Sequence, residues 1–256
     1  TTAAVPGAAL SAARYGVAAT GNSTAGYFGG GSGPRSTMDK VTYASDTTAA
    51  VPGAPLSAAR VNLAASSARA NALPLIGPAP SSPAVRFTDN TPSPNTGYFG
   101  GGSPGPRSTM DKVTYASDTT AQVPGAALSA ARYGSGGTGS STAGYFGGGN
   151  PGQVSTMDKV TYASDTTAAV PGAALSVARN SPAATGSSTA GYFGGGFPTS
   201  STMDKVTYAS DTTAAVPGAA LSAARGYLAA TGNSTAGYFG GGEPGPFSTM
   251  DKVTYS

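Results

Sequence analysis

Residues 132–179 read RYGSGGTGSSTAGYFGGGNPGQVSTMDKVTYASDTTAAVPGAALSVAR, and close variants of this stretch fill almost the whole chain of 256 residues. Its Gly-Tyr-Phe-Gly-Gly-Gly segment occurs five times, with the tyrosine at Tyr27, Tyr98, Tyr145, Tyr192 and Tyr238. A repeat of 46 or 47 residues is typical of propeller blades or of helical repeats. Residues 1–256 are therefore expected to form one tandem array in a single domain.

The composition of the repeat favours strands over helices. Each unit carries a triple glycine and a Pro-Gly pair, and both interrupt helices. In the first unit, short strand signals lie at residues 15–20, 25–28, 38–43 and 47–51, where apolar and polar side chains alternate or glycine ends the run. Four antiparallel strands per unit make a propeller blade, so the sequence predicts an all-β, five-bladed β-propeller.

The two ends of the chain predict how the ring closes. The expected blades cover approximately residues 11–53, 57–125, 129–172, 176–218, and 222–256 together with 1–7. Residues 1–5 repeat the sequence of a fourth strand, whereas residues 250–255 repeat a third strand. We expect the N-terminal strand to complete the last blade, because closure removes open sheet edges. Pairing of these ends with neighbouring molecules is the alternative.

The order of these motifs resembles the Kelch repeat. The matching elements are Tyr27-Phe28-Gly29-Gly30, Lys40-Val41-Thr42-Tyr43, Asp46-Thr47-Thr48, Pro52 and Arg60. The resemblance implies a propeller of four-stranded blades. Kelch units usually carry a Trp in the fourth strand and this chain has none, so its blades should be thinner and Kelch partner chemistry does not transfer. The repeats are also similar to the Tyr-Phe-Gly-Gly-Gly arrays predicted in phage and algal-virus structural proteins.

Charge and composition exclude several classes of function. The net charge is only +3 with no basic run, so nucleic acid is not an expected partner. No apolar run is long enough to span a membrane, and membrane insertion is not expected. The chain has no His and no Cys, and Glu243 is its only Glu. We therefore expect no catalytic residues, no metal and no cofactor, and an enzyme only as the least favoured reading, through a carboxylate pair acting on polysaccharide.

A recurring arginine follows the crossover between units. Its five positions are Arg14, Arg60, Arg132, Arg179 and Arg225. Guanidinium groups gathered near an axis could bind an anionic or sugar ligand, because Arg is a fork donor to carboxylates. The alternative is structural, with each Arg bonded to crossover carbonyls or to a nearby Asp. Identical repetition favours the structural interpretation, and the ligand-binding one is kept as a candidate.

Two further features lie between the first and second strands of a unit. Asn22 and Asn233 stand in Asn-Ser-Thr patterns, which makes them glycosylation candidates or simply polar turn residues. In the second unit, residues 61–97 include an insertion of 25 residues. A long insertion in one unit of a uniform array is a candidate functional element. Its apolar side chains are candidate assembly contacts: Leu73, Leu75, Ile76, Val85 and Phe87.

These features favour a non-enzymatic structural or adhesive propeller. It would sit in an extracellular or virion-surface fibre or filament and self-associate through its faces or through the insertion. Near-identical repeats with low charge suit such an assembly unit. The alternative is a multivalent carbohydrate-binding, lectin-like propeller, because repetition favours several equivalent glycan sites.

Overall fold

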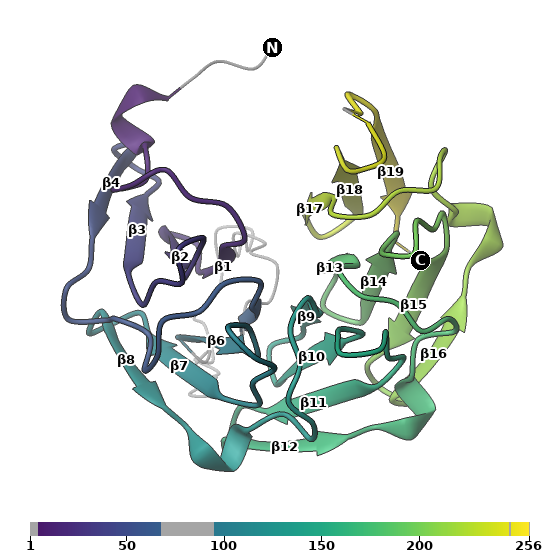
Figure 1. The fold of residues 1–256 in the computed structure, drawn as a ribbon, viewed down its shortest axis with the longest axis horizontal. Coiled ribbons are helices and arrows are strands. Elements are labelled where there is room, and N and C mark those ends of the chain that lie inside the picture. Colours follow the sequence, from purple (N-terminus) through teal and green to yellow (C-terminus); the bar gives the residue numbers. More distant parts are fainter. Residues whose placement is uncertain (1–4, 68–94, 246, 256) are drawn as a thin grey trace, which may run out of the picture.

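The structure, a computed structural model, describes residues 5–67, 95–245 and 247–255, and these form five β-sheets arranged around an axis (Figure 1). The first sheet has the order β1 (Ala18–Gly21), β2 (Ala25–Gly29), β3 (Met38–Thr42) and β4 (Thr47–Ala50), with every pair antiparallel. The prediction of an all-β propeller with five blades is confirmed.

The other four blades repeat this order. The second has β5 (Ala64–Ser67), β6 (Thr96–Gly100), β7 (Met110–Thr114) and β8 (Thr119–Gln122); the third has β9 (Gly136–Gly139), β10 (Ala143–Gly147), β11 (Met157–Thr161) and β12 (Thr166–Ala169). The fourth has β13 (Ala183–Gly186), β14 (Ala190–Gly194), β15 (Met203–Thr207) and β16 (Thr212–Ala215); the fifth has β17 (Ala229–Gly232), β18 (Ala236–Gly240) and β19 (Met250–Thr254). The register is the same throughout, as in Tyr27 opposite Lys40 and Tyr98 opposite Lys112.

The triple glycine ends the second strand of each blade, as its composition predicts. In the first blade Gly30 and Gly31 have φ of +73° and +125°, which L-residues with a side chain rarely adopt. A Cβ on Gly30 would also lie 2.6 Å from the carbonyl oxygen of Arg60 in the following crossover. Glycine therefore serves both the turn and the close approach of the next blade.

The hydrophobic core lies between successive blades. One cluster joins Tyr27 and Met38 of the first blade to Phe99, Val113 and Tyr115 of the second, all at most 6% exposed. The rings of Tyr27 and Tyr115 stack with centroids 4.9 Å apart. Because each blade is a thin sheet, burial of its two faces depends on its neighbours.

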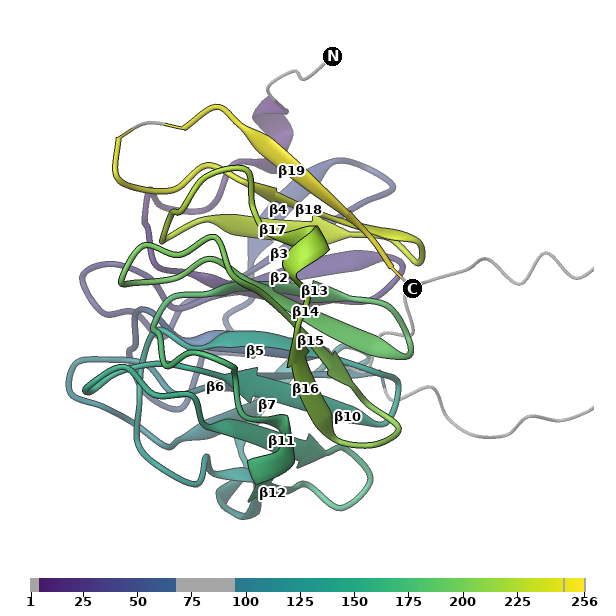
Figure 2. The ribbon, with the colours of Figure 1, turned by 90° about the vertical axis from the view of Figure 1, so that its right-hand side faces the viewer.

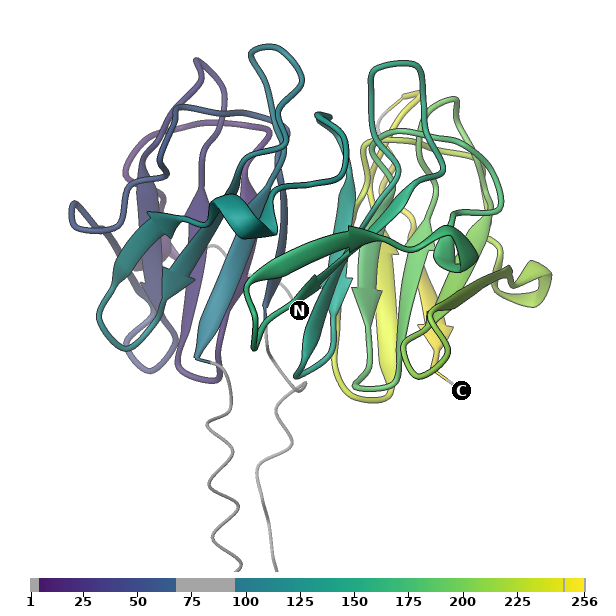
Figure 3. The same ribbon diagram turned by 90° about the horizontal axis from the view of Figure 1, so that it is seen from below.

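The hairpins divide the disc into two faces. The short turns after the first and third strands lie on one face, and the longer loops and crossovers lie on the other (Figures 2 and 3). Crossovers carry short 3₁₀ helices: η1 (Pro6–Ala8), η2 (Pro124–Ala126), η3 (Pro171–Ala173) and η4 (Pro217–Ala219). Each of η1, η2 and η3 contacts the outer strand of the blade that follows it, respectively β4, β12 and β16.

Within residues 5–67, 95–245 and 247–255, the last blade has three strands, whereas each of the other four has four. The strand predicted to complete it comes from residues 1–7, of which residues 1–4 lie outside the described part of the chain. In the described part, η1 already lies against β4 of the first blade, and Figure 1 shows the ring open between the first and last blades.

Candidate functional site

The five repeated arginines lie inside the blades, each beside the aspartate that is the second residue of the third strand. The ion pairs are Arg14–Asp39, Arg60–Asp111, Arg132–Asp158, Arg179–Asp204 and Arg225–Asp251. The N–O distance is 2.7 Å for Arg132 and 2.8 Å for Arg179. The guanidinium side chains are at most 2% exposed. The crossover thus delivers each Arg to the end of strands two and three of its own blade.

Main-chain carbonyls take up further donors of these arginines. Arg60 donates to the carbonyl oxygens of Gly101 at 2.8 Å and Thr109 at 3.0 Å. Arg132 and Arg179 donate to those of Phe146 and Phe193, each at 3.1 Å. Burial lowers the pKa of Arg60, and the negative charge of Asp111 opposes that shift. These contacts with Asp side chains and main-chain carbonyls support a structural role for the five arginines. A ligand could reach the buried guanidinium groups only by displacing protein.

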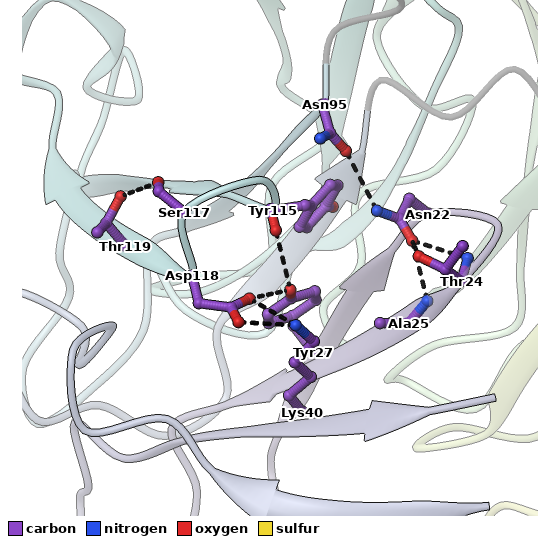
Figure 4. Close-up of polar contacts among 10 residues, drawn as sticks. All are labelled: Asn22, Thr24, Ala25, Tyr27, Lys40, Asn95, Tyr115, Ser117, Asp118 and Thr119. Carbon is purple, nitrogen blue, oxygen red and sulfur yellow. Dashed lines mark hydrogen bonds and ion pairs between the residues drawn. The ribbon is translucent and has the colours of Figure 1, made fainter. Parts of the chain in front are cut away.

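A second repeated link joins each of the first three blades to the blade that follows it, and the sequence did not reveal it (Figure 4). Tyr27 in β2 donates its hydroxyl to the carboxylate of Asp118, which lies in the turn between β7 and β8. Lys40 in β3 binds the same carboxylate, with Nζ 2.7 Å from Oδ2. The same arrangement recurs in two further sets: Tyr98, Lys112 and Asp165; and Tyr145, Lys159 and Asp211.

The electrostatics of this link fit its geometry. Burial alone would raise the pKa of Asp118, but hydrogen bonds from Lys40 and Tyr27 outweigh it and hold that pKa below 3.8. Burial and the Asp118 carboxylate raise the pKa of Tyr27 well above 10. Asp118 also has φ of 50°, a left-handed turn conformation that Asp tolerates. The fixed spacing of Tyr, Lys and Asp was the available signal, but a single repeat cannot show that they belong to neighbouring blades.

The glycosylation candidates cap the turn after the first strand. The side-chain oxygen of Asn22 accepts hydrogen bonds from the main-chain N–H groups of Thr24 at 2.8 Å and Ala25 at 2.9 Å, and its amide donates to Asn95 (Figure 4). Asn233 caps Thr235 and Ala236 in the same way. Ser140 and Ser187 do so with their hydroxyls in blades three and four. A polar turn role is therefore present, and glycosylation stays a prediction.

The insertion leaves the second blade between β5 and β6. Ser67 and Asn95 are the described residues on either side of it, so it begins on the face that carries the short turns. The predicted assembly contacts Leu73, Leu75, Ile76, Val85 and Phe87 lie outside the described residues.

The five inner strands enclose a cavity of about 270 Å³ at the axis. Most of its wall is glycine, alanine and a ring of hydroxyl side chains, with Phe28 and Tyr43 of the first blade beside them. The hydroxyl residues at equivalent positions are Thr20, Ser66, Thr138, Thr185 and Thr231. Four of these also bond a tyrosine hydroxyl of the next blade, as Thr20 does with Tyr115 at 2.6 Å. The cavity is thus polar and uncharged.

No further chemistry is apparent in the part of the chain that the structure describes. Within those residues, no three His, Cys, Asp or Glu side chains gather where they could hold a metal ion. The described helices include none that is long and apolar enough to cross a membrane.

Comparisons with known proteins add no family to this geometry. No protein-family model matches the chain, and no curated protein matches its sequence.

Proposed function

We propose that this chain is a non-enzymatic structural or adhesive propeller, a subunit of an extracellular or virion-surface fibre or filament. The observation that carries the proposal is the use of the repeated charged residues. In the described blades, Arg and Asp are buried against each other and Lys pairs with Asp across blades. Conserving the same links from unit to unit maintains a scaffold, whereas an active site needs unlike groups that converge.

The proposed assembly contact is the insertion between β5 and β6. It interrupts one blade of an otherwise uniform array and departs from the face formed by short turns. Loops positioned by a rigid scaffold commonly carry binding functions. We further propose that the units are Kelch-type repeats, and the similarity to Tyr-Phe-Gly-Gly-Gly arrays predicted in phage and algal-virus structural proteins supports a surface role.

The test replaces residues 68–95 with the Ser-Ser-Thr turn that connects β9 and β10, which restores the spacing of the third blade. The variant should give the circular dichroism spectrum and melting behaviour of a folded propeller while losing assembly in sedimentation velocity and electron microscopy. A matched control keeps the insertion and replaces Leu73, Leu75, Ile76, Val85 and Phe87 with Ser. Assembly retained by both variants would reject the insertion as the contact.

The second candidate is a carbohydrate-binding propeller, supported by the ring of hydroxyl groups around the axial cavity. In ligand pockets, Ser and Thr hydroxyls and main-chain groups fix the orientation of the ligand, and sugar hydroxyls can hydrogen-bond to such groups. A glycan array read with the wild-type chain and with Thr138→Val distinguishes the two. Binding that Thr138→Val weakens would favour this candidate over the structural one.

A further inference from the structure

The first and last blades carry the two halves of a side-chain interface that occurs repeatedly inside the chain. In the described residues, the tyrosine of a second strand stacks on the tyrosine after the next blade's third strand four times, with centroids 4.8–5.0 Å apart. The Lys–Asp link occurs in three of these interfaces. By repeat position, the last blade supplies Tyr238, Thr231 and Lys252, and the first blade supplies Tyr43 and Asp46.

The exposure of these residues shows that each half lacks the neighbour that buries its equivalents in the other blades. Met250 in β19 is 62% exposed, whereas the equivalent methionines of the other blades are at most 2% exposed. Those methionines are Met38, Met110, Met157 and Met203. Tyr43 is 45% exposed, whereas its equivalents Tyr115 and Tyr162 are 6% and 5% exposed. Both halves therefore leave apolar surface in water that four other blade junctions bury.

The axial cavity connects the two halves. Besides the inner strands, its walls include Gly26, Phe28 and Tyr43 on the open side of the first blade. In the second blade the position of Gly26 is held by Gly97, where a Cβ would lie 2.4 Å from the Thr20 hydroxyl of the blade before. Gly26 has no such neighbour within the described residues, although Thr231 lines the same cavity.

We propose that the partner of the last blade is the first blade of the same chain, and that the ring closes through a fifth copy of this interface. Tyr238 then stacks on Tyr43, and the Thr231 hydroxyl bonds the Tyr43 hydroxyl. The carboxylate of Asp46 accepts hydrogen bonds from Tyr238 and Lys252. Phe28 packs on Met250, as Phe99 packs beside Gly29 and Met38 in the first junction. This contact is separate from the outer strand predicted from residues 1–7.

Three observations agree with closure, and the last of them favours the same chain over a second copy. Thr20 and Thr231 line one axial cavity, so the inner strands of the two blades face the same central space. Asp46 and Lys252 carry opposite charges, matching the pairs that link the other blades. Two halves on one chain also meet at a high effective concentration. Head-to-tail contacts between repeated units form a ring when the rotation from one unit to the next adds up to a full turn.

The first test uses the unaltered protein, because each blade holds one methionine of this set. Dilute peroxide is applied to the native chain, and oxidation at the five methionines is followed by peptide mass spectrometry. Oxidation follows exposure, so a closed ring should oxidise Met250 no more than about threefold faster than Met157. A larger ratio means that the fifth interface is open and overturns the proposal.

The second test separates closure within one chain from pairing between chains. Asp46→Asn and Lys252→Met are combined in a double-mutant cycle, with Asp118→Asn and Lys40→Met as the matched cycle at an internal interface. The urea midpoints should show the same coupling in both cycles, independent of protein concentration, with a monomer in sedimentation equilibrium. Absence of coupling at Asp46, or coupling that appears only with dimerisation, refutes closure within the chain.

Discussion

Replacing Arg132 with Met should destabilise the chain strongly, although the substitution removes no apolar contact surface. The guanidinium group pairs with Asp158 at 2.7 Å and donates to the carbonyl oxygen of Phe146 at 3.1 Å. The side chain of Asp158 is 0% exposed, so the variant would leave a carboxylate without its counter-ion in the interior. Removal of one member of a buried pair typically costs about 3–5 kcal/mol.

This loss of stability comes from the unpaired buried charge of Asp158 and not from the net stabilisation that the ion pair provides. In a chain of this size about 1 kcal/mol shifts the melting temperature by roughly 2–4 °C, so a loss of about 6–20 °C is expected. Replacing both members with apolar residues, as in Arg132→Met with Asp158→Leu, should recover most of the loss because no buried charge remains. The same reasoning applies at Arg179 and Asp204, which are equally buried.

The assay is urea unfolding followed by circular dichroism and tyrosine fluorescence, since the chain has no Trp. Arg35→Met is the matched control, because the Arg35 side chain is exposed and donates a long hydrogen bond to the carbonyl oxygen of Ser32. An Arg132→Met variant that unfolds at the same urea concentration as the control would refute the structural role. Loss of a bound ligand at unchanged stability would instead restore the ligand-binding interpretation.

Three other perturbations test the links between blades. Tyr98→Phe should lower the free energy of unfolding by about 1 kcal/mol, because its hydroxyl donates to Asp165, and urea unfolding beside the exposed control Tyr15→Phe measures it. Gly101→Ala should lower the free energy of unfolding by about 1–3 kcal/mol, since φ is +70° and a Cβ would lie 2.5 Å from the carbonyl oxygen of Arg132. Gly105 has φ of +67° but open space around it, so Gly105→Ala measures the backbone strain without the clash. The pKa of Asp118 and of Asp211 is lower in the folded chain than 3.8, so the unfolded chain binds more protons in acid. The free energy of unfolding should therefore fall as the pH drops below 3.8. An acid titration by circular dichroism should show a shallower decline for an Asp118→Asn, Asp211→Asn variant.

The strand pattern could be predicted from one repeat because its signals are local. Glycine at positive φ after Tyr27-Phe28, alternation through Met38 to Thr42, and Pro-Gly after the fourth strand each act within a few residues. Five copies then supplied the number of blades. Local preference and global architecture agree here, which is typical of a sequence that specifies one fold.

The partners across blades could not be predicted in the same way. Tyr27 and Asp118 are 91 residues apart, and Asp118 has a counterpart, Asp46, in the same blade as Tyr27. In identical repeats the sequence cannot distinguish a contact within a blade from a contact with the next one. The curvature of the ring decides, because it places the turn after the third strand over the preceding blade.

This ambiguity also explains why the two aspartates of a repeat have different roles. Asp111 is the second residue of a third strand and is buried against Arg60 in its own blade, whereas Asp118 follows that strand and reaches Lys40 of the previous blade. The first pair ties the crossover to its own sheet, and the second ties one sheet to another. Substitution at Asp111 should therefore weaken one blade, while substitution at Asp118 should weaken the junction between two. Hydrogen exchange distinguishes them: Asp118→Asn should speed exchange in the first and second blades together, and exchange confined to one blade would contradict this division of roles.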